Sequence, residues 1–211
     1  MMLDEETRKE VEKLLSEMRD EVTVVYIEGD SPLNVQIKQL LNELVSINNK
    51  LSLKIYKQDD KEARVLGARD SPAIVLLGKN IRGRIIYYGI PSGYEFATFL
   101  DTIIKASTNN PALSSKAKEF LDNLNKQLRI SVFVTPACPH CPVSASLAFR
   151  FALYSEKIIA EVIESSEFPE WADRFSVMGV PKTVINDDKN KNYVGGYPEE
   201  LAVDKIKQMI K

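Results

Sequence analysis

Apolar runs and helix-favouring stretches alternate along this chain, which predicts a fold of alternating strands and helices. Short runs rich in valine, isoleucine and aromatic residues, such as 24–27 and 130–134, have the composition of buried strands. We expect strands at 21–27, 51–56, 73–77, 83–88, 129–134, 158–164, 183–186 and 192–194. We expect helices at 5–19, 32–46, 61–66, 93–106, 113–126, 138–155, 169–176 and 198–210.

The two halves of the chain share an internal repeat. Three matches recur in the same order: Val25 with Val132, Gly89-Ile90-Pro91 with Gly196-Tyr197-Pro198, and Ser71-Pro72 with Val180-Pro181. The first two have an offset of 107 residues and the third an offset of 109, so a loop absorbs the difference. The sequence therefore predicts a tandem duplication of one folding unit.

Each predicted unit consists of a strand–helix–strand half followed by a strand–strand–helix half. This order is that of glutaredoxin and thioredoxin. The expected fold class is α/β, with two tandem thioredoxin/glutaredoxin-like units, each a mixed four-stranded sheet flanked by helices. The polar stretch Ser107-Thr108-Asn109-Asn110-Pro111 suits a domain boundary, so we expect units at 1–111 and 112–211.

The chemistry of the chain is concentrated in Cys138-Pro139-His140-Cys141, which contains both cysteines and the only histidine. The motif lies where a predicted strand gives way to a helix. A Cys138 thiolate there would be favoured by unpaired backbone N–H groups and the helix dipole. This context is typical of a redox pair. The alternatives are a static disulfide, whose four-residue loop would constrain the unfolded chain little, and half of a metal site.

Composition narrows the possible partners. The 28 basic residues nearly balance the 30 acidic ones, and no long basic run indicates nucleic acid as a partner. No stretch approaches a transmembrane span. The acidic start 1–6 is unlike a signal peptide, so we expect a soluble, cytoplasmic protein. A lone cysteine pair in a reducing cytosol is more often catalytic than structural.

Three segments resemble the glutaredoxin-like protein disulfide oxidoreductases of thermophilic archaea and bacteria. They are Thr135-Pro136-Ala137-Cys138-Pro139-His140-Cys141-Pro142, Phe168-Pro169-Glu170-Trp171-Ala172-Asp173 and Val177-Met178-Gly179-Val180-Pro181-Lys182. The resemblance implies two fused units that act on disulfides in protein substrates, recycled by a thioredoxin-reductase-type flavoprotein. The chain has no nucleotide-binding glycine motif, so we expect no cofactor in it and assign flavin or nicotinamide to a partner.

The first unit departs from that family, whose members usually carry a cysteine pair in each unit. Ser31-Pro32-Leu33-Asn34 stands at the position of the second unit's motif, with Ser31 matching Cys138 and Asn34 matching Cys141. Neither side chain can form a disulfide. We expect the first unit to keep its fold without thiol chemistry, with Ser31 as a helix N-cap and Pro32 as the first helical residue.

Roles follow for the residues of the second unit's motif. Cys138 is the expected exposed nucleophile, and Cys141, one turn into the helix and more buried, is the expected resolving cysteine. Pro139 fixes the backbone at the helix start. His140 is expected to favour the Cys138 thiolate and so to tune the redox potential, against the alternative of an exposed histidine without influence.

The dipeptide Val180-Pro181 stands just before a predicted strand. The resemblance suggests a cis peptide bond that faces the cysteine pair and turns the Val180 backbone towards substrate. The alternative is an ordinary trans loop proline. The recurrence of the proline as Pro72 in the first unit favours the cis form.

A few other positions have weaker interpretations. Glu161 and Glu164 flank a predicted strand and are expected to be solvated, although a buried carboxylate there could relay protons to the resolving thiol. Trp171 is expected to be partly buried core rather than part of a substrate groove. The stretch 187–190 is expected to be only a hairpin turn.

The sequence thus predicts a protein thiol–disulfide oxidoreductase, with a catalytic second unit and a structural or substrate-binding first unit. One alternative is a peptide-binding or chaperone-like module in which the cysteine pair is a redox latch. Another is iron–sulfur or zinc binding through a cysteine pair shared between two copies of the chain.

Overall fold

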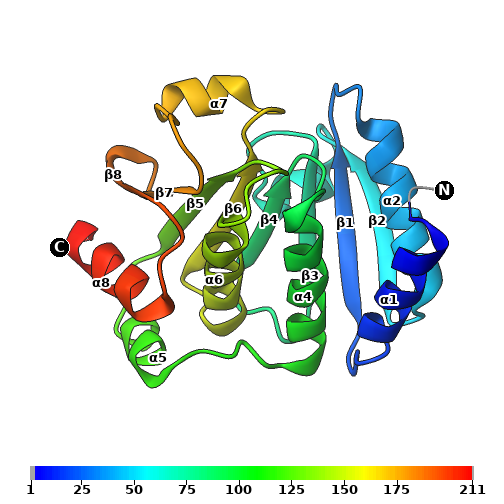
Figure 1. Ribbon diagram of the computed structural model, residues 1–211, viewed down its shortest axis with the longest axis horizontal. Helices are drawn as coiled ribbons and strands as arrows, with labels where there is room; N and C mark the ends of the chain where they lie inside the picture. Colours follow the sequence, from blue (N-terminus) through cyan, green and yellow to red (C-terminus); the bar gives the residue numbers. More distant parts are fainter. Residues whose placement is uncertain (1–2, 211) are drawn as a thin grey trace.

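The computed structural model describes residues 3–210, which contain one mixed sheet of eight strands with helices on both faces (Figure 1). The strands are β1 (Val22–Glu28), β2 (Leu51–Lys57), β3 (Ala73–Gly78), β4 (Arg84–Tyr88), β5 (Leu128–Val134), β6 (Ile158–Glu164), β7 (Lys182–Ile185) and β8 (Asp188–Val194). The helices are α1 (Glu5–Leu15), α2 (Asn34–Ile47), α3 (Lys61–Leu66), α4 (Tyr94–Thr108), α5 (Ser115–Asp122), α6 (Cys141–Tyr154), α7 (Pro169–Arg174) and α8 (Glu199–Met209).

The strand order is β2-β1-β3-β4-β6-β5-β7-β8, and its pairings repeat. In the first half β1 is parallel to β2 and antiparallel to β3, which is antiparallel to β4. In the second half β5, β6, β7 and β8 have the same relationships. The expectation of two separate four-stranded sheets is wrong, because β4 and β6 pair in parallel and join all eight strands. This pairing satisfies two strand edges that would otherwise be exposed.

Two apolar layers enclose the sheet. Side chains of α1, α2, α4, α5, α6 and α8 pack on one face, and those of α3 and α7 pack on the other. Successive strand residues alternate between the layers: in β4, Ile85 and Tyr87 join the first, whereas Ile86 and Tyr88 join the second. The central strands are therefore buried on both faces, which agrees with their nearly continuous apolar sequences, whereas the edge strands β2 and β8 are mostly exposed or half-buried.

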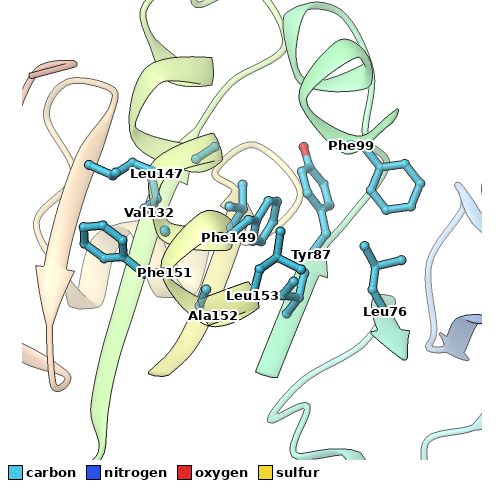
Figure 2. Packing of buried hydrophobic residues seen from close by; sticks show 14 of the residues in the cluster. Leu76, Tyr87, Phe99, Val132, Leu147, Phe149, Phe151, Ala152 and Leu153 are labelled. Carbon is cyan, nitrogen blue, oxygen red and sulfur yellow. The ribbon is translucent and has the colours of Figure 1, made fainter. Parts of the chain in front are cut away.

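The core is continuous between the two halves of the chain. Figure 2 shows Phe149 and Leu153 of α6 beside Tyr87 of β4, with Phe99 of α4 on the other side of that ring. The Tyr87 and Phe99 rings meet edge to face at 6.5 Å between centroids. Helices α4 and α6 lie side by side on this face (Figure 1), so one packing layer holds both halves together.

Each predicted strand and helix has a counterpart, but some boundaries differ. Helices α2 and α6 begin at Asn34 and Cys141, three residues later than the cysteine position of the motif. A turn precedes each helix: the Asn34 N–H donates to the Ser31 carbonyl at 3.2 Å, as the Cys141 N–H does to the Cys138 carbonyl at 3.4 Å. The expected N-cap role of Ser31 is therefore wrong. The β7–β8 turn is formed by Asn186 and Asp187, both with positive φ, rather than by 187–190.

Among residues 3–210, no helix combines the length and the apolar character that crossing a bilayer requires.

Candidate redox site

Cys138 and Cys141 form a disulfide at the end of β5, with their Cα atoms 5.5 Å apart. A turn leads into the helix: the Cys138 N–H donates to the Thr135 carbonyl at 3.1 Å, and the Cys141 N–H donates to the Cys138 carbonyl at 3.4 Å. Cys138 is 8% exposed and Cys141 is fully buried. Cys138 is thus the less buried of the two cysteines, as expected, but the expectation that it is exposed is wrong.

The disulfide lies at the N-terminal end of α6, although Cys138 itself precedes the helix. Cys141 is the first helical residue, not a residue one turn into the helix as the sequence suggested. The bond to Cys141 places the Cys138 sulfur next to the first residue of the helix. Unpaired N–H groups at a helix N-terminus and the helix dipole stabilise a thiolate once the bond is reduced.

Pro139 and His140 form the exposed outer side of this turn. His140 is the N-cap of α6, and its carbonyl accepts the Val143 N–H at 3.3 Å. The turn after β8 packs against it, because a Cβ on Gly196 would lie 2.8 Å from the His140 carbonyl oxygen. Glycine at position 196 is therefore required for this close approach. No hydrogen bond of the His140 side chain occurs within residues 3–210.

The Val180-Pro181 peptide bond is cis, as expected, and so is Ser71-Pro72 of the first half. Pro181 is buried and its carbonyl accepts the Gly195 N–H at 2.8 Å. Val180 is half-buried and contacts the apolar clusters on both sheet faces. Within the described residues, its backbone N–H and carbonyl have no hydrogen-bond partner. These two polar groups remain free at the start of β7.

One edge of the sheet gathers the elements of the site. β4 and β5 both run parallel to β6, so the loops that follow β4, β5 and β6 leave the sheet at the same edge. β7 runs antiparallel to β5 and begins at that edge. The disulfide, the Val180-Pro181 segment and the start of α4 therefore share one edge, the carboxyl edge, where α/β sheets commonly bind ligands.

A buried carboxylate at this edge was missed by sequence analysis. Glu95, in the first turn of α4, is fully buried, and neither of its oxygens has a hydrogen-bond partner within residues 3–210. Burial raises the pKa of Glu95 to about 7, with a smaller opposing effect of the Thr98 hydroxyl. The Tyr94 N–H donates to the Pro136 carbonyl at 3.1 Å, which ties the start of α4 to the loop that carries Cys138.

Two more carboxylates follow β6 at the same edge. The Glu167 N–H donates to Glu164 Oε2 at 2.8 Å, and the Ile90 N–H donates to Glu167 Oε1 at 2.8 Å. The remaining oxygen of each carboxylate is buried without a partner in the described part of the chain. Burial is the main cause of the raised pKa of Glu167, and the Glu164 charge adds to it. The expectation that Glu164 is solvated is wrong, because the Gly89–Ile90 turn of the first half covers it.

Glu161 is also buried rather than solvated. It lies on β6 beside the β4 seam, where Arg69 donates to it through Nε at 3.1 Å and Nη2 at 2.5 Å. The Tyr88 hydroxyl donates to Oε1 at 3.1 Å and the Ser131 hydroxyl to Oε2 at 2.9 Å, and Arg129 also pairs with Oε1. This network ties the two halves together and does not include the cysteine pair. It was missed because its partners are far apart in sequence.

Asp187 and Trp171 complete this structural cluster. Asp187 pairs with Arg69 at 2.9 Å, so the β7–β8 turn contributes more than a chain reversal. Trp171 is half-buried, as expected, with its ring 5.1 Å from that of Tyr88 and under the Arg69 guanidinium at 4.7 Å. These contacts place Trp171 in the seam between the halves.

The first half has a different arrangement at the position of the motif. Asn34, at the position of Cys141, accepts the Tyr26 hydroxyl at 2.5 Å and donates to the Gly29 carbonyl at 2.6 Å. The Ser71 N–H, before the cis proline, is occupied by the Asp70 carboxylate at 2.8 Å. A Cβ on Gly29 would lie 2.5–2.7 Å from Ser71, so these loops are closed against each other.

The possible metal ligands of residues 3–210 do not form a group of three or more that could hold a metal ion.

Comparison with known proteins identifies the part of the chain that carries the disulfide. Residues 128–210 match the family model described as a thioredoxin domain. This segment is a thioredoxin-fold domain. It contains the disulfide, the cis Val180-Pro181 bond and strands β5–β8.

Similarity to solved structures extends over nearly the whole chain. A protein disulfide oxidoreductase from Aeropyrum pernix matches 98% of this chain and 93% of its own, with a TM-score of 0.86 and 26% identity. A domain of the alkyl hydroperoxide reductase AhpF from Enterococcus faecalis also has a TM-score of 0.86, with 21% identity and 97% and 99% coverage. The chain has the fold of thioredoxin-like disulfide oxidoreductases, and the resemblance predicted from sequence is confirmed.

Curated relatives are longer proteins. The alkyl hydroperoxide reductase AhpF from Staphylococcus aureus is 22% identical over 191 residues, which is 90% of this chain and 35% of the relative. The corresponding protein of Xanthomonas campestris is 21% identical over 187 residues. The chain thus spans about a third of the length of the curated relatives that it matches.

Proposed function

We propose that this protein is a protein thiol–disulfide oxidoreductase whose reactive group is the Cys138–Cys141 pair. The observation that carries the proposal is the disulfide at the start of α6, with one outer and one fully buried cysteine. The thioredoxin-fold surroundings and the similarity to a protein disulfide oxidoreductase support it. Thiolate stabilisation by a helix N-terminus is the physical basis of reactivity at such a position.

The proposed reaction starts from the reduced pair. The Cys138 thiolate attacks one sulfur of a substrate disulfide, forms a mixed disulfide and releases the other substrate sulfur, which takes up a proton. The Cys141 thiol then loses its proton and attacks Cys138, which releases the second substrate thiol. One disulfide disappears from the substrate and one forms in this chain, a transfer of two electrons and two protons. The same steps in reverse would form disulfides.

Glu95 is our candidate for the base that accepts the Cys141 proton. Its pKa of about 7 lets it accept or give up a proton near neutral pH. Its carboxylate is buried, without a hydrogen-bond partner in the described chain, at the sheet edge that carries the disulfide. Because Glu95 comes from the first half, the reaction of the second half would depend on both halves.

Val180 is our candidate for substrate binding, together with Pro181. The free N–H and carbonyl of Val180 could pair with an extended substrate segment as an added strand does. In the first half the matching Ser71 N–H is already occupied by Asp70. This contrast supports a structural rather than a substrate-binding role for the first half.

We interpret the chain as two tandem thioredoxin-like units, 1–111 and 112–211. The repeated strand pairings, the two cis prolines and the matched starts of α2 and α6 support this division. The first unit would serve as a rigid support that covers the edge of β6 and supplies Glu95.

We further propose that a thioredoxin-reductase-type flavoprotein in the cytosol reduces the disulfide. The curated relatives are alkyl hydroperoxide reductases named AhpF, and this chain matches about a third of their length. Protein disulfides are the proposed acceptors.

The test is reduction of insulin disulfides with dithiothreitol as electron donor. We expect catalytic turnover by the wild-type chain and none by Cys138→Ser, because a hydroxyl is a poor nucleophile at neutral pH. An inactive wild-type protein that binds unfolded peptides would instead indicate a binding module with a redox latch.

A further inference from the structure

Lys182 is a buried cation directly after the cis proline. It is the first residue of β7 and is only 6% exposed. Its Nζ donates to the Phe175 carbonyl at 2.8 Å and to the Ser176 carbonyl at 2.9 Å. No carboxylate pairs with it among residues 3–210. Burial of a lysine ammonium whose hydrogen-bond partners are only backbone carbonyls costs free energy, because the charge is not paired.

In the first half an uncharged residue occupies the position that matches Lys182. The residue after its cis proline is Ala73, which is buried in the second apolar cluster. The repeated fold therefore does not itself require a lysine there. Lys182 is specific to the half that carries the disulfide.

The two carbonyls that Lys182 holds lie at the beginning of the loop that ends with Val180-Pro181. Phe175 is the C-cap of α7, and its ring packs 5.5 Å from that of Phe133 on β5. Ser176 follows in the left-handed region at φ 51°. The far end of the loop is fixed by the bond from the Gly195 N–H to the Pro181 carbonyl, 2.8 Å long. Lys182 thus connects the two ends of the loop.

Beyond Val177, whose N–H donates to the Ala172 carbonyl at 2.8 Å, the backbone between these ends makes no hydrogen bonds within residues 3–210. The N–H and carbonyl groups of Met178, Gly179 and Val180 have no partner in the described part of the chain. The Met178 side chain is 95% exposed. The position of this segment therefore depends on how its ends are held, and the Lys182 ammonium supplies two of the few bonds that hold them.

We propose that Lys182 is a positioning residue for protein substrates: it holds the 176–181 loop so that Val180 can pair with an extended segment beside the disulfide. This inference rests on the proposed function. A small disulfide without peptide groups can react at Cys138 without pairing with the loop, whereas an extended protein segment requires it. Lys182 therefore favours protein substrates over small ones, and it does not alter the thiol–disulfide exchange itself.

The test uses Lys182→Met, which keeps the length of the side chain and removes the charge and its donors. We expect the KM for insulin to rise about fivefold or more, while kcat stays within about twofold. The rate at which the prereduced protein reacts with 2-hydroxyethyl disulfide, which has no peptide groups, should also stay within about twofold. The matched control is Lys50→Met, because the Lys50 Nζ donates to the Met18 carbonyl at 2.7 Å, away from the disulfide. This control should leave both reactions unchanged.

Three results would overturn the inference. They are an unchanged insulin KM in a folded Lys182→Met, an equal loss with insulin and 2-hydroxyethyl disulfide, and the same effect in Lys50→Met. If Lys182→Met does not fold, Lys182→Gln retains two N–H donors, and an increase in KM confined to insulin is still expected, about twofold. Equal effects on the two substrates in that variant would likewise contradict the role. A wild-type protein inactive with both substrates would contradict the proposed function itself.

Discussion

Asn34 Oδ1 accepts the hydroxyl of Tyr26 at 2.5 Å, where the second half has Cys141 and Phe133 at the matching positions. Both residues are largely buried, and the Asn34 amide also donates to the Gly29 carbonyl at 2.6 Å. Where the second half has the buried Cys141, the first half has the polar Asn34, and the Tyr26 hydroxyl donates to its side-chain oxygen. The pair stabilises the first half without thiol chemistry.

Asn34→Ala should therefore reduce stability without reducing activity. The Tyr26 hydroxyl would lose its acceptor, which costs about 1–3 kcal/mol for a buried group. Adding Tyr26→Phe should recover part of that loss, because no hydroxyl is left unpaired. Urea unfolding measures the free energies, and insulin reduction should stay within about twofold in both variants. A tenfold loss of activity would show that Asn34 itself takes part in the reaction.

Glu95 should make stability depend on pH. Its pKa is about 7 in the folded protein, against 4.5 for an ordinary glutamate. Between these values the folded protein binds more protons than the unfolded chain, so the free energy of unfolding falls as pH rises. Above about pH 7, where the folded and unfolded states have both released this proton, the loss of unfolding free energy reaches about 3 kcal/mol. Glu95→Gln should remove this part of the slope in urea unfolding between pH 5 and 7. An unchanged slope would contradict the assignment.

The same variant tests the proposed catalytic role of Glu95. Without a base, Cys141 should resolve mixed disulfides more slowly at neutral pH, by about tenfold or more. The rise of rate with pH through about 7 should also disappear. Stopped-flow release of substrate thiol from the prereduced protein measures the step. A Glu95→Gln rate equal to wild type at every pH would leave Glu95 only a structural role.

Glu161 should matter for stability and not for exchange chemistry. Glu161→Gln would leave Arg69 and Arg129 partly uncompensated beside a buried amide, at a cost of about 3 kcal/mol. Denaturant unfolding can be followed by fluorescence of Trp171, the only tryptophan, whose ring lies under Arg69. The control is Asp204→Asn, which breaks an exposed pair with Lys116 and should cost under about 1 kcal/mol. Equal losses in the two variants would contradict the importance of the buried cluster.

His140 should adjust the redox equilibrium. The imidazole lies on the exposed turn between the two cysteines, where it can stabilise the Cys138 thiolate and hence the reduced form. His140→Ala should make the disulfide a weaker oxidant, by about tenfold in its equilibrium constant with glutathione. Equilibration in glutathione buffers measures this. An unchanged constant, or a stronger oxidant, would remove His140 from the mechanism.

The strands, helices and cysteine pair could be predicted because they depend on local patterns. Val132 and Phe133 are residue types that favour strands, and the cysteine motif can be read directly from the sequence. The carboxylates could not be predicted. Glu161 is buried only because β4 pairs with β6, and Glu95 only because α4 packs beside α6. Such burial arises when distant segments meet, which periodicity along one segment does not reveal.

The starts of α2 and α6 show a second limit of prediction from sequence. Ser31-Pro32 and Cys138-Pro139 have the composition of an N-cap and a first helical residue. In the structure a turn forms over residues 31–34 and 138–141, and both helices begin at the last residue of that turn. Both halves have the same helix start, although Ser31 and Asn34 stand in the first half where the second has Cys138 and Cys141.

Trapping of a mixed disulfide tests the central claim most directly. In Cys141→Ser the Cys138 thiolate can still attack, but nothing can resolve the product, so the variant should accumulate substrate adducts. Intact mass spectrometry after incubation with insulin should show one adduct per chain, absent when Cys138 is also replaced by serine. Equal trapping by Cys138→Ser and Cys141→Ser, or no adduct with Cys141→Ser, would contradict the assignment of Cys138 as the nucleophile of a disulfide oxidoreductase.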